Sequence, residues 1–211
     1  MLSQPLTLNM VEDSFTDILG WLTDRFGIAV ELTEESEIIN GPNTEGRMAG
    51  ILHAPGTTGQ VGEVVSGSAA TLTADGIIAL AYELAEQYDD DASFYMNKKS
   101  GAKTIATLKD SQNRYLFATG LMDDKLATAR PNTLIGYPFA YSALMPDIGA
   151  NTYPLLFGDA GGYLLARRVG FSIKILTETY YEQNQIVAVG RLRVGGKMIE
   201  PWRMWAQKCS T

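Results

Sequence analysis

The chain has 211 residues, of which 45% are hydrophobic and 19% are charged, an ordinary balance for a globular protein. Its formal net charge of −7 disfavours a module that grips nucleic acid through a basic face. The single cysteine, Cys209, excludes an internal disulfide, and no secretory leader is evident at the N-terminus. No apolar run reaches the roughly 20 residues that span a bilayer, so we expect cytoplasmic synthesis and no membrane partner.

The first predicted element is a long helix. Asn9 and Glu12 form a pattern typical of a capping box at its start. Apolar residues then recur at helical spacing from about Met10 to Leu32: Val11, Phe15, Ile18, Leu19, Leu22, Phe26, Ala29 and Leu32. The pattern fades through Ile38 and Ile39 and stops at the turn residues 40–42. A helix of this length, about 35 Å, is expected to support other elements packed along it.

The middle of the chain predicts a small mixed core. Residues 41–70 are rich in Gly, Thr and Ser, which indicates a loop with one short strand at Met48–Leu52. A second helix follows, with Thr73 as its N-cap and an apolar face of Ile77, Leu80, Ala81, Leu84 and Tyr88. A short buried strand is predicted at Ser93–Met96, and a third helix at Lys98–Leu108.

After Pro131 the pattern changes to strands separated by turns, which makes the predicted fold class α+β. Five β-branched and aromatic segments carry this prediction: Leu134–Tyr141, Tyr153–Phe157, Tyr163–Arg168, Phe171–Leu176 and Gln185–Val194.

No group of residues indicates a catalytic, cofactor or metal site. His53, the single histidine, stands among Leu52, Ala54 and Pro55 and is interpreted as an ordinary loop residue. Residues 56–62 resemble a phosphate loop only in glycine content, because the lysine of that motif is missing. Asp89, Asp90 and Asp91 do not match a calcium loop and are interpreted as a solvated turn. We therefore expect no enzyme and no cofactor.

Five segments, in the same order, resemble the Hong Kong 97-type major capsid proteins of tailed phages. They are Phe94–Asn97, Leu108–Phe117 (LKDSQNRYLF), Leu134–Pro138 (LIGYP), Leu155–Tyr163 (LLFGD followed by GY) and the closing region Asn184–Pro201. The resemblance extends over nearly the whole chain. It implies a spine helix packed on strands in a peripheral (P) domain, together with a mixed α/β axial (A) domain.

The resemblance also implies an organisation and a function. Residues 1–45 would form the P-domain spine helix, residues 46–168 the A domain, and residues 169–211 the returning P-domain strands. The N-arm and the E-loop hairpin of the family are expected to be absent, because Met1 stands almost at the helix. The function implied is a structural protein of a virion, forming pentamers or hexamers of an icosahedral shell that encloses DNA. Other capsid and portal proteins would be its partners, without sequence-specific binding of nucleic acid.

The same resemblance suggests where copies meet. Lys109, Asp110, Gln112 and Arg114 would lie in a loop near the capsomer axis, with Lys109, Asp110 and Arg114 pairing across copies. Self-catalysed cross-linking is not expected. Asn184 falls at the family's asparagine position, but Arg191 stands where the assisting glutamate is required. Trp202 and Trp205 could anchor an interface, because aromatic residues are enriched in interface cores, but packing against the spine helix is the preferred expectation.

Two alternative functions stay open from the sequence. An encapsulin-like nanocompartment shell would share the fold and would differ by a cargo site on its inner face. A small α+β ligand-binding or hydrolase domain would require an apolar pocket with converging polar groups.

Overall fold

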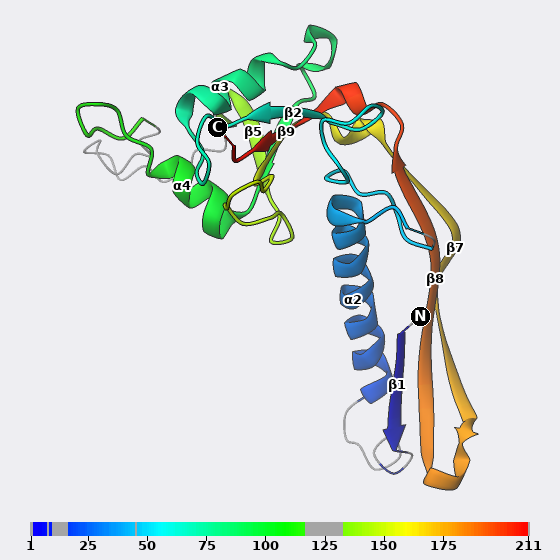
Figure 1. Cartoon of the computed structure of the whole chain (residues 1–211). Coiled ribbons are helices and arrows are strands. Elements are labelled where there is room, and N and C mark those ends of the chain that lie inside the picture. The colour runs from blue at the N-terminus through cyan, green and yellow to red at the C-terminus, as the bar shows by residue number, and fades with distance from the viewer. Residues whose placement is uncertain (1, 8, 10–16, 45, 117–132, 211) are drawn as a thin grey trace.

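The computed structural model describes residues 2–7, 9, 17–44, 46–116 and 133–210, and it has two lobes (Figure 1). The lower lobe in this view is elongated and places a long helix beside a narrow sheet. The upper lobe holds a six-stranded sheet with short helices, and the C-terminal end of the chain lies there. The α+β class predicted from the sequence is confirmed.

Helix α2 (Ile18–Asn40) is the long helix of the lower lobe. It begins at Ile18 rather than near Met10, because Asp17 acts as the N-cap and accepts a hydrogen bond from the Gly20 amide at 2.9 Å. Glu12, half of the predicted capping box, lies outside the described residues. The helix ends where the sequence predicts, before Gly41, whose amide donates to the Glu37 carbonyl.

The sheet beside α2 has three antiparallel strands in the order β1–β8–β7, namely β1 (Leu2–Thr7), β8 (Gln185–Met198) and β7 (Tyr163–Tyr180). The two strands predicted within 163–176 form one continuous strand, which absorbs irregularities through register shifts near Val169 and between Leu176 and Tyr180. Strand β1, which the sequence did not suggest, pairs Leu2 with Gly190 and Thr7 with Gln185.

A small core joins α2 to this sheet. Leu22, Phe26 and Ala188 are buried there, and Leu6, Phe171 and Ile173 pack around them. The outward face of α2 remains open, because Trp21, Ile28 and Leu32 are about half exposed. The lower lobe is therefore thin, with one helix layer on one sheet layer, and it leaves apolar surface uncovered.

The sheet of the upper lobe has the order β2–β9–β6–β3–β5–β4, with β2 parallel to β9, β3 parallel to β5 and the other neighbours antiparallel. The bounds of these strands are β2 (Gly62–Val65), β3 (Ser93–Met96), β4 (Thr133–Leu134), β5 (Tyr137–Tyr141), β6 (Leu155–Gly158) and β9 (Met204–Lys208). Strand β9, close to the C-terminal end, thus lies between β2 and β6 and not beside α2.

Short helices flank this sheet. Helix α3 (Ala74–Tyr82) has the predicted cap, since Thr73 Oγ1 accepts from the Gly76 amide at 3.1 Å. The third predicted helix is a π-helical turn, η2 (Lys98–Ala102), followed directly by α4 (Lys103–Ala106). The remaining short helices are η1 (Glu86–Tyr88), η3 (Ala160–Gly162), η4 (Tyr181–Gln183) and η5 (Pro201–Arg203). Among the described helices, none is both long and apolar enough to cross a membrane.

One expected strand is missing from the described structure. Residues 48–52 form only an isolated bridge between Pro42 and Ala49, whereas the strand of this region, β2, lies further along within the segment interpreted as a loop. At Gly62, the first residue of β2, the Trp205 ring occupies the space that a side chain would fill. A glycine in this strand therefore allows the backbone to approach an aromatic ring closely.

The main core lies on one face of the six-stranded sheet. Phe94 and Phe157 stack with ring centroids 4.4 Å apart, and both are fully buried. Ile77 and Leu80 of α3 cover them from the helix side. A second core on the other face includes Ile39 from the end of α2, so the long helix is anchored in the upper lobe as well.

Candidate functional site

The four residues predicted at a subunit interface all lie in one loop, residues 107–116, between α4 and the start of the undescribed segment 117–132. Lys109 and Tyr115 form an isolated antiparallel bridge at its base. Lys109, Gln112 and Arg114 are exposed, and the Arg114 side chain is 72% accessible. The loop therefore presents several polar side chains to its surroundings.

Asp110 determines the shape of this loop. Its carboxylate accepts hydrogen bonds from the amides of Gln112 at 2.8 Å and Arg114 at 2.9 Å, and from Arg114 Nε at 3.0 Å. The hydrogen bond from the Arg114 amide contributes most to lowering the pKa of Asp110. Asn113 completes the turn in the left-handed region, with φ of 66°, which asparagine tolerates well.

These contacts divide the four predicted interface residues into two that are paired within the chain and two that are available for new contacts. Asp110 and Arg114 are ion-paired with each other within one chain, so neither requires a partner from another copy. The Lys109 ammonium lies 4.8 Å from the centroid of the Tyr115 ring and remains exposed. Of the four residues, Lys109 and Gln112 thus have the greatest capacity for new contacts.

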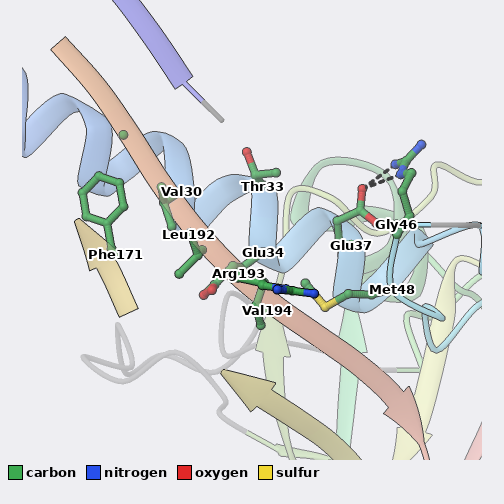
Figure 2. Close-up of a pocket in the computed structure, with 12 residues that line it drawn as sticks. Val30, Thr33, Glu34, Glu37, Gly46, Met48, Phe171, Leu192, Arg193 and Val194 are labelled. Atoms are coloured by element: carbon green, nitrogen blue, oxygen red, sulfur yellow. Dashed lines mark hydrogen bonds and ion pairs between the residues drawn. The ribbon is translucent and has the colours of Figure 1, made fainter. Parts of the chain in front are cut away.

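A second polar site, which the sequence did not reveal, is a groove of about 400 Å³ between α2 and β8 (Figure 2). Its apolar part includes Val30, Phe171 and Leu192, and its polar part includes Glu34 and Glu37 from successive turns of α2. The side chain of Arg193 lies across the groove beside Glu34 and points toward Met48. Leu192, Arg193 and Val194 are consecutive on β8 and all line the groove, an arrangement that the sequence pattern alone does not fix.

Two ion pairs hold this groove together. Arg167 of β7 donates to Glu34 at 2.6 Å, and Arg47 donates through Nε to Glu37 at 2.8 Å. The hydrogen bond with Glu37 raises the pKa of Arg47. Glu34 Oε1 and Glu37 Oε2 are buried and have no hydrogen-bond partner among the described residues. The two ion pairs link the helix to β7 and to the loop that follows the helix.

A third cluster surrounds η5, where the chain re-enters the upper lobe. Arg203 forms ion pairs with Asp159 at 2.6 Å and with Glu200, and its guanidinium lies 4.7 Å from the Tyr88 ring centroid. Trp202 Nε1 donates to the Tyr88 hydroxyl at 3.0 Å.

The expectation that both late tryptophans pack against the spine helix is wrong. Trp202 is 55% exposed, and Trp205 packs against the core of the upper lobe. Trp202 lies in η5 immediately before β9, and Trp205 lies within β9, which belongs to the six-stranded sheet.

The described residues offer no cluster for metal binding. No group of three or more His, Cys, Asp or Glu side chains converges within them. Cys209 is buried, and burial raises the pKa of its thiol, which favours the unreactive protonated form. Asp89 of the acidic turn accepts a hydrogen bond from the Tyr137 hydroxyl at 2.7 Å. In the described part of the chain these groups serve packing and hydrogen bonding.

Comparison with known proteins gives a consistent answer. The model of the phage capsid family matches residues 2–203. The capsid of an empty GTA particle, computed with C5 symmetry, aligns with a TM-score of 0.86 and 27% identity, covering 100% of this chain and 72% of that one. The capsid of the native GTA particle aligns with a TM-score of 0.87 and the same identity, covering 100% and 71%.

More distant structures share the fold. A structure from Mycobacterium phage Bobi aligns with a TM-score of 0.67 and 15% identity, covering 98% of this chain and 70% of that chain. Among proteins with curated descriptions, none matches this chain. These similarities do not favour the encapsulin-like alternative, and a capsid fold implies a structural protein. The chain belongs to the phage capsid family, and it is a major capsid structural protein of the virion with the Hong Kong 97-type fold.

Proposed function

We propose that this chain forms pentamers and hexamers, which close into an icosahedral shell around DNA. One observation carries the proposal: all of the chain superposes, at a TM-score of 0.86, on the capsid of a GTA particle computed with C5 symmetry. A ring requires a head-to-tail contact, in which two different surfaces of each subunit meet. The two-lobed shape suits this role, because a compact lobe can face the axis while the elongated lobe extends toward the rim (Figure 1).

The lobes support a division into domains that differs at two places from the sequence-based expectation. We assign the P domain to residues 1–45 together with the hairpin of β7 and β8, and the A domain to residues 46–162. Residues 199–211 join the A domain in this proposal, since β9 pairs with β2 and β6. The chain thus enters the A domain twice.

We further propose that the loop 107–116 contacts neighbouring copies near the capsomer axis. The internal pair of Asp110 and Arg114 keeps the loop in shape, while Lys109 and Gln112 reach the neighbour. Other capsid proteins and the portal are the proposed further partners, and the subunits are made in the cytoplasm of a bacterial host. Because the net charge is −7, the shell encloses DNA without sequence-specific binding.

Light scattering across a range of concentrations, with negative-stain images of the same sample, tests the ring proposal. Rings of five or six subunits are the expected result. A strict monomer at every concentration would contradict assembly by this chain alone. Lys109→Glu is expected to weaken the rings, whereas Lys197→Glu, an exposed lysine of β8 with the same charge change, leaves them intact.

A further inference from the structure

Charge is strongly segregated along the upper lobe. Four of the eight lysines of the chain fall within residues 98–109, and residues 92–109 contain no acidic residue. The preceding segment, residues 83–91, has the opposite character, with five carboxylates and no lysine or arginine. The chain therefore has a local basic region although its net charge is −7.

The basic surface consists of Lys98, Lys99, Lys103 and Lys109, which are all exposed on η2, α4 and the loop after them. Within the described residues none of the four forms an ion pair, and Lys109 contacts only the Tyr115 ring. The acids nearby have partners already. Asp147 accepts a hydrogen bond from Ser100, and Asp110 is paired with Arg114. The four ammonium groups therefore lack compensation within their own subunit.

The acidic surface consists of Glu83, Glu86, Asp90 and Asp91, which are exposed around η1 after helix α3. None of these four carboxylates forms an ion pair with a described residue. Figure 1 places the end of α3 and α4 at different ends of the upper lobe, so the two surfaces do not meet within one subunit. Each subunit thus carries two unmatched surfaces of opposite sign and similar charge.

We propose that the basic surface of one subunit docks on the acidic surface of a second copy of this chain. The inference rests on the proposed ring assembly, for which a head-to-tail contact needs two different and complementary surfaces on each subunit. Four lysines facing four carboxylates supply that complementarity and fix the direction of the ring. Two basic surfaces in contact would repel, so a symmetric dimer through this region is excluded by the same charges.

Charge reversal tests the contact. The acid-reversed chain carries Glu83→Lys, Glu86→Lys, Asp90→Lys and Asp91→Lys, and the basic-reversed chain carries Lys98→Glu, Lys99→Glu, Lys103→Glu and Lys109→Glu. Either chain alone is expected to lose self-association by at least about tenfold in dissociation constant, because its two surfaces then have the same sign. A chain with all eight changes restores both the contact and the rings. A mixture of the two reversed chains associates in alternation, which closes rings of even number only.

The matched control reverses four exposed carboxylates of the lower lobe, with Asp24→Lys, Glu31→Lys, Glu178→Lys and Glu182→Lys, which changes the net charge equally. This control chain is expected to assemble like the unmodified one, and to bind the basic-reversed chain no better than the unmodified chain does. Circular dichroism of each chain establishes that it is folded. Sedimentation at rising ionic strength gives a further readout, since exposed charge contacts weaken with salt.

The outcomes separate this inference from the proposed function. If the unmodified chain forms rings and both reversed chains form them equally well, the contact is overturned and ring assembly stands. If the unmodified chain forms only open head-to-tail oligomers, which each single reversal abolishes and the eight changes together restore, the contact stands and ring closure by this chain fails. If the unmodified chain is monomeric at every concentration, the contact is overturned as well. If basic reversal abolishes only retention of duplex DNA and leaves assembly unchanged, the surface binds phosphate and the inference is overturned.

Discussion

The carboxylate of Glu34 on α2 and the guanidinium of Arg167 on β7 lie 2.6 Å apart, and this ion pair joins the long helix to the long hairpin. The Glu34 side chain is 11% exposed and that of Arg167 is 57% exposed, so the acid is the desolvated member of the pair. One oxygen of Glu34 has no other partner among the described residues. The helix therefore depends on this arginine to keep its buried charge compensated.

Removing the arginine should destabilise the lower lobe. We expect Arg167→Ala to lower the free energy of unfolding by about 1–3 kcal/mol, because it leaves a buried carboxylate without its donor. Urea unfolding followed by circular dichroism measures the change. Arg168→Ala is the matched control, since Arg168 is exposed and has no ion pair in the described structure. Recovery of part of the loss on adding Glu34→Gln is expected, and equal losses for both arginines would contradict the assignment.

Two glycines of α2 should respond differently to alanine. A Cβ at Gly27 meets nothing within 4 Å, so Gly27→Ala should stabilise the protein by about 1 kcal/mol through helix propensity. A Cβ at Gly20 would lie 2.4 Å from Asp17 Oδ2, which displaces the capping carboxylate. Gly20→Ala should therefore lose a cap worth about 1 kcal/mol, which offsets its gain in helix propensity and leaves the stability near that of the unmodified chain. Thermal unfolding of the two variants compares them directly, and a gain at both positions would refute the cap.

The Tyr153 hydroxyl should lose its proton at a higher pH than an ordinary tyrosine does. Burial and the hydrogen bond from its hydroxyl to Glu63 at 2.7 Å raise the pKa of Tyr153 to about 12. A raised pKa means that the folded state holds the proton more tightly than the unfolded state, whose value is 10.0. The resulting stabilisation is complete below pH 10.0 and is lost as the pH rises through about 12. In Tyr153→Phe, the tyrosinate absorbance step near pH 12 should be missing. A missing step near pH 10.0 would mean that Tyr153 is unperturbed.

The loop 107–116 should loosen when Asp110 is altered. Asp110→Ala removes the acceptor for the amides of Gln112 and Arg114, so these amides should exchange hydrogen faster. Asp110→Asn keeps an oxygen acceptor and should preserve more of their protection. The pKa of Asp110 is lowered from 3.8, so its contribution is present above pH 3.8 and is lost as the pH falls below it. Unchanged exchange in both variants would show that the backbone alone forms the turn.

The local sequence pattern predicted the start of α3 and the end of α2 correctly, because neighbouring residues determine where a helix begins and ends. Thr73 precedes an apolar helical repeat, and the cap lies there because its hydroxyl satisfies a free amide of the first turn. The end of α2 at Asn40 was equally visible, since Gly41 and Pro42 follow it. The family resemblance added the arrangement of the lobes, which periodicity alone does not contain.

Contacts between distant segments could not be predicted in this way. Strand β1 is stable only beside β8, which lies more than 170 residues later in the chain, and nothing local marks it. The groove lined by Glu34 and Arg193 depends on the pairing of β8 with both of its neighbours. Trp205 was misplaced for the same reason: which sheet receives the last strand is decided by long-range packing.

The position of β9 between β2 and β6 determines when the sheet of the upper lobe can finish folding. Until residues 204–208 pair with them, β2 and β6 are not joined, and β6, whose Leu155, Leu156 and Phe157 are buried in the complete fold, has an unpaired edge. A ribosome must therefore release residues 204–208 before this lobe closes. A chain that stops before residue 204 would retain an open sheet edge, which is a template for pairing with other chains.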